Sequence, residues 1–184
     1  MSTTIISPLK KFENNPANLF EALQLFDSLP AVKTEEMSGR WSGSTFATGH
    51  PMDGMLERFG WYGKEFTDSE NVHPLLFLDT KNNIFPFLPA LIPFDFALRH
   101  LPLFNNDLVG KIFKFISWMG KTKKPGARLR MTEFRGVVST TMIYDNLAIN
   151  DIFRRVDENT LLGAMDMRRE NPFFFVLKKI KKEN

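Results

Sequence analysis

The chain contains no cysteine among its 184 residues. Without cysteine there is no disulfide to stabilise an extracellular fold, no thiol nucleophile and no cysteine-ligated zinc site. The first residues, MSTTIISPLKKFENNP, also lack the continuous apolar block of a secretory signal. We therefore expect the protein in a reducing, cytoplasmic compartment.

Long uninterrupted apolar runs are missing as well. The most apolar stretch, FPFLPALIPFDFALRHLPLF from Phe85 to Phe104, contains four prolines together with Asp95, Arg99 and His100. A membrane-spanning helix needs about twenty apolar residues whose backbone groups are all hydrogen-bonded within the helix. Proline removes a donor and charge is costly in hydrocarbon, so this stretch does not predict a span. We expect an irregular segment that protein, a ligand or a membrane surface must cover.

Catalytic motifs are absent too. The three histidines lie far apart, no serine occupies a G-x-S-x-G turn, and Gly120-Lys121-Thr122 has Phe115 where a phosphate-binding loop needs glycine. The sequence therefore predicts no catalytic residues, no metal and no cofactor, and favours a protein that is not an enzyme.

The chain is mildly basic, with a net charge of +3 and a pI near 9.2. The lysines gather at Lys111 to Lys124 and Lys178 to Lys182, which is typical of a solvated surface or of one facing an anionic partner such as lipid headgroups. No nucleic-acid-binding motif accompanies them, so we expect no nucleic acid partner.

What the chain does have is a series of short strand-like runs with tight connections. They are MSGRWSGSTFA, WYGKEF, PLLFLD, IFPFL, ARLRMTEF, VVSTTMIYD, DIFRRVD, TLLGAMDM and FFFVLKKI. Eight or nine antiparallel strands in one domain, residues 1–184, predict a mainly β fold, namely a lipocalin-like (calycin-like) β-barrel or half-barrel with accessory α-helices. A barrel of this size has room for side chains or one small ligand.

Helical spacing predicts the accessory helices. One begins at Asn15-Pro16 and ends at Leu29-Pro30, a short one spans His50 to Gly60, and one runs from Asp107 to Met119. In the last helix Trp118 falls among Lys111, Lys114 and Lys121. A tryptophan among lysines suits a membrane interface, so the proline-rich stretch and this helix could form a movable rim that touches anionic membranes transiently; a helix packed on the barrel is the alternative.

The motif Gly39-Arg40-Trp41-Ser42-Gly43 places two glycines on the same face of a strand as the indole of Trp41. Glycine in a strand marks a close approach, so we expect these glycines to make room for a buried Trp41. Residues 37–66 resemble the GXWXG family on this motif.

Residues 127–180 are similar to the companion domain of unknown function, of the DUF4334 type. The short motifs RGVVS, MIYD, FRRVD and LGAMD occur there in order. The two resemblances imply a small bacterial protein with no assigned reaction. The GxW motif is also similar to that of lipocalins and haem-binding nitrobindins, in which a GxW strand begins a ligand-binding barrel. That likeness implies haem as an alternative ligand.

Hairpin geometry predicts which side chains face inward. A two-residue turn at Arg135-Gly136 puts Met131 and Met142 on one face with Tyr144, and one at Glu158-Asn159 puts Arg154 opposite Gly163 on the face of Met165. A buried guanidinium needs a partner, either Asp145, Asp151 or Asp166, or the anionic group of a ligand. The candidate ligand-binding residues are Trp41, Phe85, Phe87, Met131, Met142, Tyr144, Arg154 and Met165.

These residues predict a binding protein for a hydrophobic or amphipathic small molecule, lipid-like or fatty-acid-like, held in the barrel. The alternatives are an enzyme that uses Asp145, Asp166 and Tyr144 for acid–base chemistry on a lipid-like substrate, and a purely structural protein with a filled barrel. Interior volume and a raised carboxyl pKa in the interior are the observations that separate them.

Overall fold

The structure, a computed structural model, describes residues 7–91 and 107–181, without the side chains of Asp107 and Trp118. Its strands match the runs expected from the sequence closely. They are β1 Gly39–Thr45, β2 Trp61–Phe66, β3 Val72–Leu78, β4 Ile84–Pro86, β5 Ala127–Phe134, β6 Val137–Tyr144, β7 Ile149–Asp157, β8 Thr160–Met167 and β9 Phe173–Lys179.

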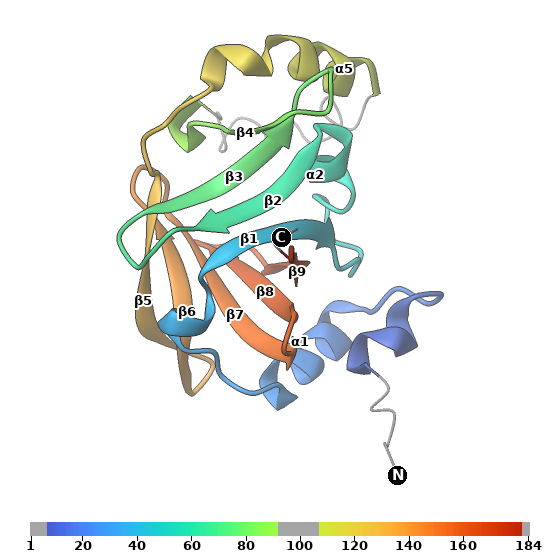
Figure 1. Ribbon diagram of the computed structural model, residues 1–184. Coiled ribbons are helices and arrows are strands. Elements are labelled where there is room, and N and C mark those ends of the chain that lie inside the picture. Colours follow the sequence, from blue (N-terminus) through green and yellow to red (C-terminus); the bar gives the residue numbers. More distant parts are fainter. Residues whose placement is uncertain (1–6, 92–106, 182–184) are drawn as a thin grey trace.

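The strands form one antiparallel sheet in the order β2-β1-β9-β8-β7-β6-β5-β3-β4, and β2 also pairs with β3. That extra pairing closes eight of the strands into a ring and leaves β4 beside β3 (Figure 1). The predicted antiparallel barrel is thus confirmed. The seam between β3 and β5 is its weakest joint, because a single residue pair, Val72 with Ala127, joins them.

Tight turns join consecutive strands where the sequence indicates them. Arg135 and Gly136 both adopt positive φ, of 53° and 76°, which is the two-residue hairpin geometry that matches strand twist. The predicted turn before Ile84 is also present, because the Asp79 carboxylate accepts hydrogen bonds from the backbone N–H groups of Lys81 and Asn83. These connections fix the order of the strands.

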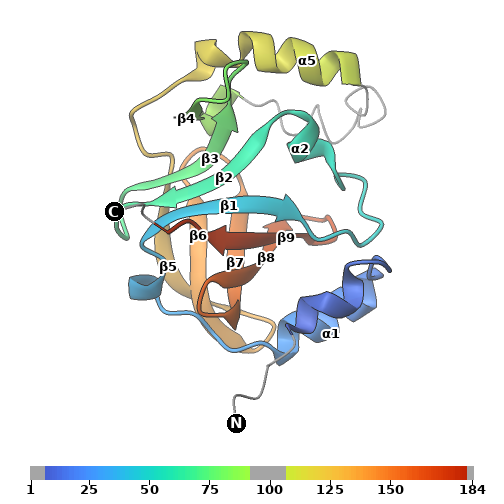
Figure 2. The same cartoon turned by 45° about the vertical axis from the view of Figure 1, so that its right-hand side comes forward.

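Helix α1 spans Leu19–Ser28, later than the expected start at Asn15. The helix begins where it does because Asn18 caps it: its Oδ1 accepts the backbone N–H of Glu21, and the Glu21 carboxylate accepts the backbone N–H of Asn18, each at 3.0 Å. The helix packs against the outside of β7, β8 and β9 through Phe26, Leu162 and Phe174 (Figure 2). This outer core is separate from the barrel interior.

The other helices are short. They are α2 Met55–Arg58, α5 Asp107–Ile116 and the 3₁₀ turns η1 Pro8–Phe12, η2 Thr34–Glu36, η3 Pro89–Leu91 and η4 Ser117–Gly120. Helix α5 and η4 together correspond to the predicted helix from Asp107 to Met119, and α5 lies across one end of the barrel (Figure 1). No helix in residues 7–91 and 107–181 is long and apolar enough to cross a membrane.

Part of the proline-rich stretch is described. Residues 85–91 contribute to β4 and η3, where Phe85 and Phe87 are buried, whereas residues 92–106 lie outside the described residues. Phe87 packs against Phe77 and Phe113 with ring centroids 5.4 and 5.7 Å apart. The start of the stretch is therefore core that closes the α5 end of the barrel.

Candidate functional site: a charged pair inside an apolar barrel

Large side chains occupy the barrel interior. Phe66, Phe153, Phe175 and Trp61 form a chain of edge-to-face ring contacts, with successive centroids 5.8, 6.2 and 5.9 Å apart. Each of these residues is at least 95% buried. Aromatic contacts of this kind hold an interior rigidly in one arrangement, so the polar groups among them are fixed in place.

Two ionisable side chains meet inside this apolar surrounding. Lys64 of β2 is 2% exposed and Asp151 of β7 is fully buried, and Lys64 Nζ lies 2.7 Å from Asp151 Oδ2. Counting round the ring, β2 and β7 are four strands apart in both directions, so they form opposite walls. The ion pair therefore crosses the barrel interior from wall to wall.

The lysine is held from several sides. Its Nζ donates to the backbone carbonyl of Pro74 at 3.1 Å and to Tyr144 Oη at 3.5 Å. The ammonium group also lies over aromatic faces, 4.9 Å from the ring centroid of Phe175 and 5.6 Å from that of Trp61. Ring faces attract a cation, and the attraction is strongest where water is excluded. The interior is thus built to hold one positive charge.

The carboxylate is less well satisfied than the ammonium. Asp151 Oδ1 accepts no hydrogen bond from any described residue, and the buried Trp61 Nε1 has no acceptor among them. Burial raises the pKa of Asp151 against the opposing effect of Lys64, and burial together with Asp151 raises the pKa of Tyr144 well above 10.0. Buried polar atoms without partners are costly, so this acceptor and this donor are available to a molecule that enters.

Methionines flank the carboxylate. Asp151 stands opposite Met142 of β6 on one side and opposite Met165 of β8 on the other, and all three belong to one row across the sheet. Both methionines are buried in the interior cluster. Their unbranched side chains adapt to irregular shapes, so the wall around the ion pair is the deformable part of the interior.

A bulge in β2 brings Lys64 inside. Gly63 has φ +149°, and the pairing of β2 with β3 shifts register on either side of it. Trp61 and Lys64, three residues apart, consequently both point inward, whereas strict alternation places them on opposite faces. Alternation applied to WYGKEF therefore misses Lys64, and the glycine within the strand is the signal that could have revealed it.

Most of the sequence-predicted ligand-binding residues lie in the same buried interior cluster. They are Trp41, Phe85, Phe87, Met142, Tyr144 and Met165. The expected burial of Trp41 is confirmed, because its side chain is 1% exposed and its Nε1 donates to the carbonyl of Met37 at 2.8 Å. Gly43, however, makes room for Trp61: a Cβ at Gly43 would lie 2.2 Å from that ring.

The predicted inward orientation of Arg154 is wrong. A register shift between Arg155 and Asp157 pairs Arg154 with Leu162 instead of Gly163, and a one-residue slip turns a side chain to the other face of a sheet. Arg154 is fully buried under α1, where its guanidinium stacks over the Phe26 ring at 5.0 Å and donates to the carbonyl of Phe134. It lies in the outer core, near Asp27, with its Nε and Nη1 lacking hydrogen-bond partners among the described residues, and it does not line the interior.

Met131 also lies outside the interior. The predicted register of β5 with β6 is confirmed, with Leu129 opposite Met142 and Met131 opposite Thr140. The Met131 side chain is nevertheless 44% exposed, because β3 pairs with β5 only at Ala127 and leaves the far part of β5 unpaired on that edge. A shared strand face therefore does not make every residue on it interior.

The carboxylates predicted for the enzyme alternative do not converge on Tyr144. Asp145 is on the surface, paired with Arg128 at 3.1 Å, and Asp166 lies on the face of β8 opposite to that of the interior Met165 and Met167. The interior carboxyl is Asp151, which the sequence indicated only as a possible partner of Arg154. Of the groups predicted for acid–base catalysis, only Tyr144 lies in the interior, and Asp151 is the buried carboxyl near it.

The histidines of the described residues do not offer haem an axial ligand in the centre of the barrel. A haem iron needs an axial ligand such as histidine. His73 lies on the outer side of β3 opposite Glu65, and His50, at the edge of the interior, uses its Nδ1 to accept the backbone N–H of Met52; His100 lies outside the described residues. No group of three metal-ligating side chains occurs in the described part of the chain.

A separate open groove of about 850 Å³ lies at the opposite end of β1 and β2 from α5. Gly39, Phe66, Asn159 and Lys179 contribute to its walls, together with an Arg40–Glu65 ion pair at 2.9 Å. Arg40 and Glu65 pair with each other in this open groove, whereas Asp151 Oδ1 is buried in an apolar interior without a hydrogen-bond partner among the described residues. The interior charged pair is therefore the better candidate site.

Comparisons with known proteins agree with this architecture. A family model described as GXWXG protein matches residues 24–81, and one described as Domain of unknown function (DUF4334) matches residues 125–179. A protein from Thermomonospora curvata with a crystal structure is similar to this chain, with 30% sequence identity, a TM-score of 0.67 and coverage of 94% of this chain and 96% of that chain. No curated protein matches at a significant level. The chain belongs to the family in which a GXWXG segment is followed by a DUF4334 segment.

Proposed function

We propose that the barrel binds a small amphipathic molecule, a fatty acid or a close analogue, whose carboxylate is held by Lys64, Tyr144 and Trp61. The observation that carries the proposal is the set of buried polar atoms in an apolar interior: a lysine whose counterion is imperfectly satisfied, and an indole N–H without an acceptor. A ligand carboxylate supplies an acceptor for the Trp61 N–H and the Tyr144 O–H and a second counterion for Lys64.

The charge of Asp151 is compatible with such a ligand. Burial raises its pKa, so the Asp151 carboxyl takes up a proton more readily than an exposed aspartate when a second carboxylate arrives beside Lys64. Two carboxylates in contact cannot both remain ionised, and the protonated one donates a hydrogen bond to the other. Lys64 then keeps one net counterion in both the free and the bound state.

Space for the acyl chain comes from movement of interior side chains. Met142 and Met165 border Asp151 and can change rotamer at little cost. The α5 end is the simplest route of entry, because Phe113 closes it by inserting between Phe59, Phe77 and Phe87. Movement of Phe113 together with the neighbouring Phe87 ring would open this end of the apolar interior.

Calorimetric titration with hexadecanoic acid and with hexadecanol tests the proposal. The wild type is expected to bind the acid, and Lys64→Met should weaken that binding at least tenfold while leaving the alcohol nearly unaffected. Lys178→Met, which alters an exposed lysine of β9, is the matched control. Native mass spectrometry of freshly purified protein should also show a bound acid.

A double variant serves as a control for misfolding of the single variant. Lys64→Met combined with Asp151→Leu removes both charges, which avoids an unpaired buried ion. If the wild type binds neither compound, or if this folded double variant binds the acid as tightly as the wild type, the proposal is wrong.

Acid–base catalysis on a lipid-like substrate is the second candidate. The raised pKa values of Asp151 and Tyr144 favour it, since perturbed ionisable groups concentrate at catalytic sites. Turnover of a bound ester or enol that is lost in Asp151→Asn, with binding retained, would distinguish an enzyme from a carrier.

A further inference from the structure

Helix α5 has a fixed orientation on the barrel. Phe113 points inward, with its ring centroid 5.1 Å from that of Phe59 and 5.3 Å from that of Phe77. Gly110 lies so close to α2 that a Cβ there would be 2.8 Å from the carbonyl oxygen of Arg58. One side of the helix is thus committed to the barrel, and the remaining sides face outward.

The outward side is apolar. Ile112, Phe115 and Ile116 of α5 and Met119 of η4 follow the i, i+3, i+4, i+7 spacing of one helix face, and they are 51%, 71%, 47% and 71% exposed. We call these four residues the α5 outer face. A helix that packs on a core by one side normally carries polar residues on the other, and contiguous exposed apolar residues mark an interaction surface.

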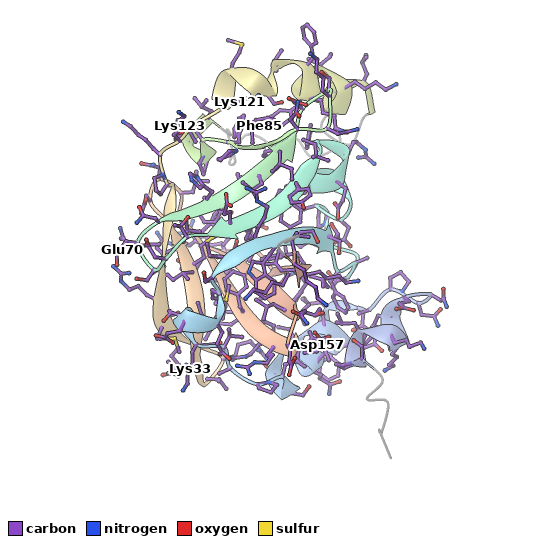
Figure 3. All side chains as sticks on the ribbon, in the orientation of Figure 1. Lys33, Glu70, Phe85, Lys121, Lys123 and Asp157 are labelled. Atoms are coloured by element: carbon purple, nitrogen blue, oxygen red, sulfur yellow. The ribbon has the colours of Figure 1, made fainter. Side chains whose placement is uncertain are left out.

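Positive charge surrounds the α5 outer face. From residue 108 to residue 132 the sequence has seven Lys and Arg residues and no Asp or Glu, although the net charge of the whole chain is only +3. Lys111, Lys114, Lys123 and Lys124 form no ion pair with any residue that the structure describes. Lys121 pairs with Asp79 at 3.7 Å, and Figure 3 shows Lys121 and Lys123 at the α5 end of the molecule near Phe85.

We propose that the α5 outer face docks on anionic lipid bilayers, with its apolar side chains among the acyl chains and the surrounding lysines at the headgroups. The arrangement is that of an interfacial helix, in which apolar burial and attraction to anionic lipid act together. A second copy of the chain fits less well, because a two-fold interface through this face would bring lysines against lysines.

Co-sedimentation with vesicles tests the docking. The wild type is expected to bind vesicles of phosphatidylcholine with phosphatidylglycerol at low salt, to bind pure phosphatidylcholine at least tenfold less, and to dissociate at high salt. Phe115→Ser with Met119→Ser should reduce binding at least tenfold, and so should Lys111→Glu with Lys123→Glu. All four positions are exposed, so these variants should keep the wild-type melting temperature.

Matched controls lie at the other end of the molecule. Phe20→Ser changes a phenylalanine that is 67% exposed on α1, and Lys33→Glu reverses a lysine that Figure 3 places far from Lys121; both should bind as the wild type does. Absence of wild-type binding at low salt overturns the proposal. So does equal binding by Phe115→Ser with Met119→Ser, or a stable dimer that this variant dissociates in the absence of lipid.

Discussion

At the scale of single residues, the Lys64–Asp151 pair dominates the interior. Both side chains are almost fully buried and their charged atoms lie 2.7 Å apart. Removing water from two charges is costly, and their mutual attraction offsets that cost only while both are present. The pair therefore stabilises the fold less than its short distance implies, but each member depends strongly on the other.

Asp151→Leu is expected to destabilise the protein by about 3–5 kcal/mol, because it leaves Lys64 as an uncompensated buried charge. Adding Lys64→Met should recover most of that loss, since an apolar pair of similar volume avoids the desolvation of both ions. Chemical denaturation of the wild type, the single variant and the double variant measures both values. A double variant no more stable than Asp151→Leu would contradict this account.

His50 makes stability depend on pH. Burial lowers the pKa of its imidazole below the usual 6.5, so the unfolded chain binds a proton in a pH range where the folded chain does not. Stability is then complete above about pH 6.5 and is lost as pH falls through the folded-state pKa. The raised pKa of Asp151 acts with the opposite sign, since its contribution is lost as pH rises.

His50→Asn isolates the histidine contribution, because an amide oxygen can still accept the backbone N–H of Met52 but does not titrate. Between pH 8 and pH 5 the melting temperature of His50→Asn should fall less than that of the wild type. Both proteins contain Asp151, so its effect on the pH dependence cancels in this comparison. Parallel pH curves for the two proteins would show that His50 does not contribute.

At the scale of elements, two irregularities decide which side chains share a face. The bulge at Gly63 brings Lys64 inside, and the register shift after Arg154 places that arginine under α1. Because side chains alternate with period two, each irregularity reverses the faces of all residues beyond it. The candidate site depends on the first.

Gly63→Ala is expected to cost at least about 3 kcal/mol of stability. Its φ of +149° is open only to glycine, and a Cβ there would lie 1.9 Å from the carbonyl oxygen of Trp41. Gly136→Ala is the control, since its φ is also positive but nothing lies within 4 Å, so about 1 kcal/mol is expected. Equal melting temperatures for the two variants would contradict a role of close packing at Gly63.

At the scale of the whole molecule, both family segments build one ring. The GXWXG segment supplies β1, β2 and β3, and the DUF4334 segment supplies β5 to β9. They join at a long pairing between β1 and β9 and at the single pair between β3 and β5. The two joints are therefore very unequal in strength.

Hydrogen exchange should reflect this inequality. Amides of β8, which is paired along its length on both sides, are expected to exchange most slowly, and those of β4 and of the facing edges of β3 and β5 fastest within the sheet. Mass spectrometry of peptic fragments measures the difference. Exchange at the facing edges of β3 and β5 as slow as at β8 would show that the seam is not the weak joint.

Features that depend on neighbouring residues can be predicted from the sequence alone. Turn residues and alternating apolar positions fixed the hairpins and most strand boundaries, and they fixed the register of β5 with β6 as far as Tyr144. The GXWXG and DUF4334 motifs fixed the family. These signals are local, so they can be recognised without knowing how the strands pack.

Which polar residues meet in the interior depends on how the strands pack in three dimensions. Lys64 and Asp151 come from opposite walls of the ring, and no local pattern relates them. Whether a strand bulges depends on how it packs against its neighbours. Gly63 lies against the backbone of β1, and the segment after α1 pairs with Arg154 through Ala31. The faces assigned from alternation therefore failed at Lys64 and Arg154, because both lie next to a bulge that long-range contacts stabilise.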